Sequence, residues 1–541
     1  MRIKKWAMVA LVIGVCMFLV SPALHAKDQE VAVISGNKEL AASSYIIKVA
    51  SMKEFDAASL QALGGQVLDE WNFINTIKVQ LPSSKVSQLA SFPGILAVTP
   101  EAGVVSNAKG GNKGGNKGGD TPPPSNNDPG TTNPPADNSN GNAVNHSYTS
   151  MDDQLANTYN YAVRADRVWA KGITGKGITV AVLDSGIDGD AGSDFGDRLI
   201  RTVKLNSDAN YAADKYGHGT HVAGIIAGDG KKSGGKYMGI APGANLISVK
   251  YSNDEGKATE GDFLSALEWV YDNHEKYNIR VVNISSGVNV KQSYKQSAVA
   301  AAVELLWHKG IVVVVSSGNI GGTDCSTCYA PANDPYVITV GAVDDNNTKD
   351  LTDDYMKSWS SIGKTLDGHN KPEIVAPGSE IVAYMPGGAL RKKSPENVVD
   401  EEYFKMGGTS MATPVVSGIV ALMLEKHPEW TPDQVKWVLQ NSTREYGLVD
   451  MDAKDSKDTK STKSINQEHH NPGLVSADKA VFFNEVPGQA NQGLEPSSFL
   501  VDPATGEVLY DHMSWAHMSW AHMSWAHMSW AHMSWAHSFD K

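Results

Sequence analysis

A serine stands where an apolar helix is expected to begin. Ser410 lies within residues 407–414, a stretch of small residues that ends in Pro414, and the apolar run 415–424 follows it. Proline fits a first helical turn, where no backbone N–H is needed, so the pattern predicts a buried helix with Ser410 at its mouth. Unpaired amide groups and the positive end of the helix dipole gather there. Such a serine can attack a carbonyl and stabilise the resulting oxyanion, or it can act only as a helix cap.

A serine nucleophile needs a base to take its proton, and the resulting imidazolium needs a carboxylate partner. Residues 217–224 open a second helix of small residues and supply His218 as a base. His221 lies one turn further on, where we expect it to be packed or hydrogen-bonded. A metal site made by the two histidines is the alternative, which the missing His-Glu-x-x-His pattern of zinc proteases disfavours.

Two further polar residues follow predicted buried strands. Asp184 ends the apolar run 179–183, and Gly186 permits a sharp turn directly after it. Asn319 follows the run 311–315, and its amide can donate to a developing oxyanion without changing its charge. For each residue the alternative is a local role in a turn.

These residues need a scaffold, and the surrounding pattern supplies one. Near-continuous apolar runs are typical of strands buried on both faces, and here they alternate with stretches of helical character. The runs are residues 179–183, 246–249, 281–284, 311–315 and 337–340, with helical stretches at residues 261–277 and 294–309. This alternation predicts an α/β fold with a mainly parallel sheet and helices on both faces. Ligands of such sheets bind beyond the carboxyl ends of the strands.

The motifs Gly-His-Gly-Thr-His-Val-Ala-Gly and Gly-Thr-Ser-Met-Ala-x-Pro resemble those of subtilisin-like serine proteases, and the resemblance extends over residues 166–481. It implies a secreted endopeptidase that hydrolyses peptide bonds through an acyl-enzyme and needs no cofactor for its chemistry. Asp184 would orient His218, His218 would act as general base and then acid, and Ser410 would attack. Asn319 would bind the oxyanion together with the amide of Ser410.

The same resemblance implies where a protein or peptide substrate binds. The edge segment that pairs with extended substrate would be Ser285, Ser286 and Gly287, and one wall of the first specificity pocket would be Ser316, Ser317 and Gly318. Two alternatives remain. Acid proteases of the sedolisin class use a glutamate base and an aspartate at the oxyanion position, which His218 and Asn319 argue against. A catalytically silent, subtilase-fold surface binding module is the other.

Residues 45–105 predict a small α+β unit ahead of this domain. Its expected order of strand, helix, strand, strand, helix, strand is ferredoxin-like. The segments are residues 45–49, 53–63, 66–71, 76–81, 83–91 and 95–100. The unit resembles the propeptide of the subtilisin inhibitor type, which serves as folding chaperone and intramolecular inhibitor. We therefore expect a self-processing precursor whose final strand leads into the active site. Cleavage would fall within residues 101–108 or, alternatively, within or after the linker.

The remaining segments divide the chain. Residues 1–26 carry a basic start, a 14-residue apolar stretch and a small-residue end, as secretory signals do. We therefore expect an extracellular or envelope-associated protein that has no membrane span once the signal is removed. The propeptide unit would cover residues 27–105 and a flexible Gly/Asn/Pro linker residues 106–149. The catalytic domain would span residues 150–486, and a tail with five His-Met-Ser-Trp-Ala repeats residues 487–541.

Composition sets further limits. Lys and Arg number 47 against 60 Asp and Glu, a net charge of −13, which argues against a nucleic-acid partner. After signal removal only Cys325 and Cys328 remain, and export favours a small loop-closing disulfide over free thiols. Residues 229–236 do not match the best-known calcium loop of the resembled family. No clear motif therefore supports a structural calcium ion, and no metal ligand is assigned.

Overall fold

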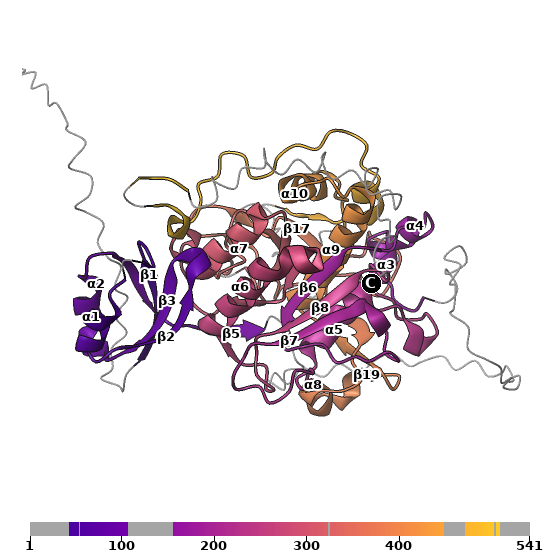
Figure 1. Ribbon diagram of the computed structural model, residues 1–541. Helices are drawn as coiled ribbons and strands as arrows, with labels where there is room; N and C mark the ends of the chain where they lie inside the picture. Colours follow the sequence, from indigo (N-terminus) through magenta and orange to yellow (C-terminus); the bar gives the residue numbers. More distant parts are fainter. Residues whose placement is uncertain are drawn as a thin grey trace, which may run out of the picture.

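A computed structural model describes residues 43–53, 55–106, 155–322, 325–447, 471–502 and 505–508 (Figure 1). The proposed signal segment, almost all of the linker, residues 448–470 and the five repeats lie outside the described residues. The described chain forms a small N-terminal unit, residues 43–106, beside a large unit that begins at residue 155. Across the described ranges, no helix has the length and hydropathy needed to cross a bilayer.

The small unit is a four-stranded antiparallel sheet with strand order β2-β3-β1-β4, covered by two short helices. Its elements are β1 Ser43–Val49, α1 Ala57–Ala62, β2 Gln66–Trp71, β3 Thr76–Leu81, α2 Val86–Ala90 and β4 Ile95–Pro100. This order confirms the ferredoxin-like prediction. The first helix begins four residues later than expected, because Asp56 caps it by accepting the amide N–H of Ala58 at 3.0 Å. Leu60, Val79 and Leu89 lie in the small core of this unit.

The large unit is built on a nine-stranded sheet whose main path runs β21-β17-β13-β12-β10-β6-β8-β7, and every neighbouring pair on that path is parallel. The bounds are β6 Thr179–Asp184, β7 Leu199–Lys204, β8 Asn245–Lys250, β10 Ile279–Ile284, β12 Val312–Ser316, β13 Ile338–Asp344, β17 Ile374–Pro377 and β21 Gly473–Leu474, with β14 Tyr355–Met356 antiparallel to β13. The central strands β6, β10 and β12 are buried along their lengths apart from Arg280. Their near-continuous apolar character follows from this burial.

Helices cover both faces of the sheet, as predicted (Figure 1). One pair consists of α5 His218–Ala227 and α9 Thr409–Lys426, which pack against each other. The other pair consists of α6 Glu260–Tyr277 and α7 Ala298–His308. The chain continues through α10 Pro432–Asn441 and α11 Ala477–Val481. Parallel strands joined by helices place the carboxyl ends of β6 and β10 at one edge of the sheet, and that edge holds the site described below.

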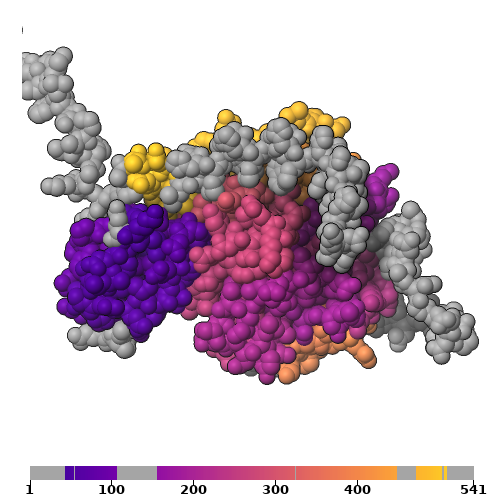
Figure 2. Space-filling model, in the orientation of Figure 1, coloured from indigo at the N-terminus to yellow at the C-terminus, as the bar shows by residue number. Residues whose placement is uncertain are grey.

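The small unit docks on the α6–α7 face of the large one. Trp71 donates from Nε1 to the Ser265 hydroxyl at 3.1 Å, and the Glu101 carboxylate accepts the Gly261 amide at 3.2 Å. After β4 the chain enters the large unit as β5 Gly103–Ser106, which forms a three-stranded sheet between β11 Ser286–Val288 and β9 Ala258–Thr259. The space-filling view shows the two units packed side by side (Figure 2).

The large unit continues past residue 486, which the sequence analysis predicted as the end of the catalytic domain. Phe499 and Leu500 are buried and belong to the same apolar core as the central sheet. The described residues 487–502 are therefore part of the folded body.

Candidate active site

Asp184 and His218 face each other at the carboxyl end of β6. Asp184 is the last residue of β6, and His218 is the first residue of α5. The imidazole Nδ1 lies 2.8 Å from Oδ1 and 2.9 Å from Oδ2 of the carboxylate, so Nδ1 carries the proton that it donates. Both side chains are buried. The predicted carboxylate and the predicted base are thus brought together, with Nε2 of the ring turned away from the carboxylate.

Burial alone would lower the pKa of His218, because it disfavours the charged ring. The charge of Asp184, its hydrogen bond and the more distant charge of Asp214 outweigh burial and raise the pKa of His218 above its usual value. His221 behaves oppositely: burial lowers its pKa to about 3, and Nε2 of the neutral ring donates toward the carbonyls of Phe404 and Ile381, 2.9 and 3.2 Å away. The expectation that His221 is hydrogen-bonded is confirmed.

Asp214 fixes the relative position of Asp184 and His218, and the sequence interpretation missed it. Its Oδ1 accepts the Ser185 hydroxyl at 2.9 Å and the Gly217 amide at 2.7 Å, directly beside the two site residues. Its Oδ2 accepts both the amide and the hydroxyl of Thr220, at 2.9 and 2.7 Å. One buried carboxylate therefore ties the turn after β6 to the first turn of α5. An aspartate just ahead of a predicted helix was the only signal in the sequence.

Ser410 is the second residue of α9, and it is buried. The interpretation that Pro414 lies in the first turn is wrong, because the helix begins at Thr409 and Pro414 is its sixth residue. At that place proline removes the amide that would pair with the carbonyl of Ser410. The Ser285 hydroxyl replaces it and donates to this carbonyl at 3.0 Å.

Ser285 and Ser410 are linked a second time. The Ser410 hydroxyl donates to the carbonyl of Ser285 at 2.8 Å. Across the described part of the chain, no hydrogen-bond partner faces the buried Nε2 of His218. The structure thus holds Ser410 on the segment that follows β10, while the outer nitrogen of the imidazole stays available for a proton.

Asn319 is oriented by Thr409, the residue before Ser410. The Thr409 amide and hydroxyl both donate to Oδ1 of Asn319, at 3.0 and 3.1 Å. A backbone N–H can only donate, so the atom that faces it is the amide oxygen, and the NH₂ group lies on the other side of the side chain. The Thr409 hydroxyl also accepts the Gly318 amide at 3.2 Å. Thr409 is a positioning residue that the sequence interpretation missed, although it stands inside the motif of Ser410.

The predicted substrate segments border the same site. Ser286 and Gly287 lie in β11 and pair with Ser106 and Val105 of β5. Ser316 ends β12, and Ser317 donates its amide to the carbonyl of Val340 at 3.0 Å. A small cavity lies beside β5, lined by Asp184, Ser185, Tyr216, Tyr251, Ser286 and Val104, among others. The N-terminal unit therefore occupies the edge segment that the sequence assigned to substrate.

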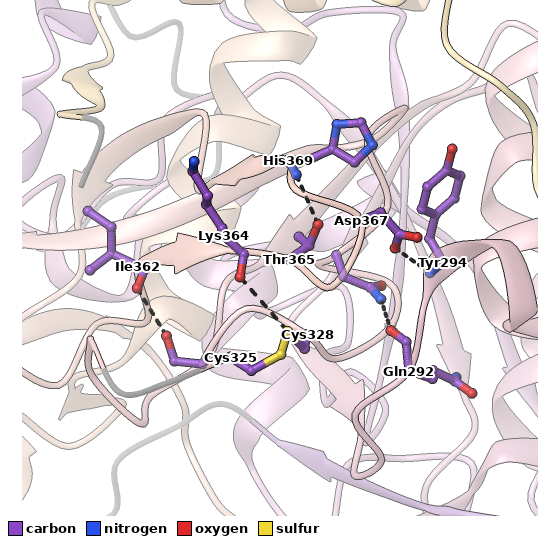
Figure 3. The surroundings of a disulfide bond; sticks show 11 residues. Gln292, Tyr294, Cys325, Cys328, Ile362, Lys364, Thr365, Asp367 and His369 are labelled. Atoms are coloured by element: carbon purple, nitrogen blue, oxygen red, sulfur yellow. Dashed lines mark hydrogen bonds between the residues drawn. A yellow bond between two sulfur atoms is a disulfide. The ribbon is translucent and has the colours of Figure 1, made fainter. Parts of the chain in front are cut away.

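Cys325 and Cys328 form a disulfide with 5.2 Å between their Cα atoms, which confirms the predicted pairing (Figure 3). The loop that it closes is hydrogen-bonded to two other segments of the large unit. The amide of Gln292, beyond β11, donates to the carbonyl of Cys328 at 3.1 Å, and the hydroxyl of Ser326 donates to the carbonyl of Ile362 at 3.1 Å. Cys328 itself is fully buried.

The loop at residues 229–236 uses its acidic oxygens for protein contacts. Asp229 accepts the Lys231 amide at 2.9 Å and pairs with the Arg198 guanidinium at 3.4 Å. The neighbouring Asp194 accepts the Lys232 amide at 2.8 Å and the Tyr403 hydroxyl at 2.6 Å. In the described ranges, no three His, Cys, Asp or Glu side chains are grouped so that they could hold a metal ion. The carboxylates of Asp194 and Asp229 are thus engaged in contacts within the protein.

Comparisons with known proteins agree with this geometry. The model of the subtilase family matches residues 175–470. The chain is 38% identical over 343 residues to the serine protease AprX of Bacillus subtilis (strain 168), which covers 62% of this chain and 72% of that protein. It is 34% identical over 306 residues to subtilisin NAT of Bacillus subtilis subsp. natto, covering 55% of this chain and 70% of that protein.

A solved structure shows the same fold. The crystal structure of fervidolysin from Fervidobacterium pennivorans, described as a keratinolytic enzyme related to subtilisin, aligns with a TM-score of 0.56 and 23% identity over 84% of this chain and 63% of that one. Family match, sequence identity and fold agree with one another. The chain belongs to the subtilase family and is a subtilisin-like serine endopeptidase.

Proposed function

We propose that this peptidase is exported as a self-processing precursor and cleaves proteins through an acyl-enzyme at Ser410. The observation that carries the proposal is the pairing of Asp184 with His218 at the edge of the sheet where Ser285 holds Ser410. Export rests on residues 1–26, whose basic start and apolar stretch have the form of a secretory signal.

The chemistry follows from the polar contacts. The Ser410 hydroxyl turns from the carbonyl of Ser285 to Nε2 of His218, gives up its proton and attacks the substrate carbonyl. Asp184 keeps the Nδ1 proton in place and stabilises the imidazolium that forms. The oxyanion is bound by the Asn319 amide and the Ser410 N–H. His218 then protonates the leaving amine, and water hydrolyses the acyl-enzyme by the same path in reverse.

The N-terminal unit would inhibit the enzyme before release. β5 fills the edge position beside Ser286 and Gly287, with backbone pairing that tolerates many sequences. Its register sets Ser106, the last described residue of β5, opposite Ser286, and the preceding residue Ser285 is the one that bonds to Ser410. We therefore place the processing cut at the bond between Asn107 and Ala108, within the predicted range 101–108.

The test expresses the full chain in a host that lacks its own secreted proteases. Wild type should yield a mature protein that begins at Ala108, whereas Ser410→Ala and His218→Ala should remain uncut. Ser417→Ala is the matched control, because Ser417 is a buried serine on the same helix that bonds to Asn283 at 2.9 Å. It should be processed normally. Mature protein of normal size from His218→Ala would overturn self-processing, and a different N-terminus would overturn the register.

A further inference from the structure

A C-terminal strap, residues 488–502, is anchored along the large unit by specific polar contacts. Nδ2 of Asn491 donates to the carbonyl of Tyr336 at 2.9 Å, and the Tyr336 hydroxyl donates to the carbonyl of Leu494 at 3.0 Å. Further on, the Tyr294 hydroxyl donates to the carbonyl of Glu495 at 2.7 Å. These contacts order the main chain of the strap, and none of them is made to Asp184, His218 or Ser410.

The strap also closes over a buried carboxylate. Glu304 of α7 is fully buried, and its two oxygens accept the amide of Ser497 at 3.0 and 2.9 Å. Burial and the neighbouring Asp334 carboxylate raise the pKa of Glu304 well above its usual value. A buried carboxyl without a hydrogen-bond partner lowers the stability of the fold. The contact with Ser497 therefore holds the strap at a defined place on α7.

Beyond Ser497 the strap reaches the N-terminal unit. The short 3-10 helix η11 Ser498–Leu500 packs on α7, and the turn η2 Asn72–Ile74 of the N-terminal unit packs on the same helix. Phe499 and Leu500 share one apolar core with Ile46, Trp71 and Ile74 of the N-terminal unit. Figure 2 shows the yellow end of the strap along the line where the indigo unit meets the rest of the molecule.

One charged side chain of the N-terminal unit lies against the strap. Lys48 of β1 is 4% exposed, donates to the carbonyl of Ile74 at 2.9 Å and places Nζ 5.6 Å from the centre of the Phe499 ring. Burial lowers the pKa of Lys48 to about 7, and the charge of Asp502 in the strap opposes that shift. A buried ammonium gains stability from an aromatic face and a nearby carboxylate, and here the strap supplies both.

We propose that the strap is a second docking element for the N-terminal unit, which holds that unit on the peptidase through Phe499 in addition to β5 and the α6–α7 face. The inference rests on the proposed role of this unit as inhibitor. The proposal gives the strap, a segment distant from the active site, a role in regulation. The strap slows release of the inhibitor after cleavage. Truncation before Phe499, or loss of its ring, then weakens inhibition while the catalytic residues stay in place.

The test uses the full chain carrying Ser410→Ala, so that no cleavage occurs, and follows amide hydrogen exchange. Phe499→Leu removes the ring and keeps apolar bulk, and Lys48→Met removes the cation from the other side. Each variant should raise exchange of the β5 and β11 amides by about 3- to 30-fold, the range expected for a desolvated cation–ring contact. The effect of the double variant should be smaller than the two single effects combined, because both substitutions remove the same cation–ring contact.

Glu495→Gln is the matched control. It alters an exposed ion pair between the strap and Lys295, which involves no residue of the N-terminal unit, and should leave β5 exchange unchanged. The proposal is overturned if Phe499→Leu leaves exchange of β5 and β11 unchanged, or if the two variants act additively. Exchange in the central strands β10 and β12 separates general loss of stability from loosened docking. Failure of the inhibitor role would give a different result: processing or peptidase activity would be unaffected although the contact between the strap and the N-terminal unit is intact.

Discussion

Substitution of Thr409 tests the role of the Asn319 amide as oxyanion donor without removing that amide. Its hydroxyl donates to Oδ1 of Asn319 at 3.1 Å and accepts the Gly318 amide at 3.2 Å, while its own amide gives Asn319 a second bond at 3.0 Å. Thr409→Val keeps the shape of the side chain and the backbone bond, and removes the hydroxyl. Asn319 then keeps one of its two bonds from Thr409, and the half-buried Gly318 amide loses its acceptor.

The size of the effect can be bounded. Loss of one oxyanion donor costs about 10²- to 10³-fold in kcat, a magnitude that was measured on the oxyanion asparagine of subtilisin, a relative of this enzyme. If the bond from the Thr409 hydroxyl carries half of that free energy, Thr409→Val should lower kcat by about 10- to 30-fold. KM should change little, because the oxyanion exists only near the transition state. The orphaned amide of Gly318 should also cost about 1–3 kcal/mol of stability.

The assay is steady-state hydrolysis of a chromogenic peptide by matured enzyme, with calorimetry on the same samples. Thr409→Ser keeps the hydroxyl and should recover most of kcat. In an Asn319→Ala background, Thr409→Val should have almost no further effect on kcat, because the residue that it orients is gone. The reasoning is refuted if Thr409→Val leaves kcat within about twofold of wild type, or lowers it equally in both backgrounds.

Three further outcomes are expected. Because the base must be neutral, the raised pKa of His218 shifts the acidic limb of kcat/KM to higher pH, and Asp184→Asn should move that limb to lower pH, which a pH–rate profile measures. Glu425 accepts the amides of residues 174–176 at 2.7, 2.5 and 3.0 Å, so Glu425→Gln should lower stability by about 2 kcal/mol in denaturant unfolding of an inactive variant, and an unchanged midpoint would contradict this. Reduction of the Cys325–Cys328 disulfide with a dithiol should cost about 2 kcal/mol from the entropy of so short a loop, and a Cys325→Ser, Cys328→Ser variant should show no response to the reductant.

The sequence was most informative where a motif coincides with the end of an element. Asp184 and His218 were predicted from a buried strand and a small-residue helix, and the structure places them within hydrogen-bonding distance. Such positions are readable because the strand-to-helix topology brings distant segments to one edge of the sheet. The order of the small N-terminal unit was predictable for a similar reason, since each of its segments has a local pattern and a local boundary.

What the sequence missed depends on contacts between distant segments. Pro414 was placed in a first turn because proline is usual there, yet tertiary packing extends α9 back to Thr409, and Ser285 satisfies the carbonyl that proline leaves without a donor. The end of the folded body was set at residue 486, where the repeated strand and helix signals stop. The pairing of Ser497 with Glu304, almost two hundred residues away, has no local signature, and the adjacent apolar residues 499–501 were the only clue.

Covalent labelling tests the central claim most directly. Matured wild-type enzyme is treated with a fluorophosphonate and digested, and the modified peptide is sequenced by mass spectrometry. We predict a single adduct on the Ser410 hydroxyl, no adduct in Ser410→Ala that has been cut by an added protease, and normal labelling of Ser417→Ala. An adduct on another residue, or a matured wild-type chain that takes up no label, would contradict the assignment of Ser410 as the nucleophile.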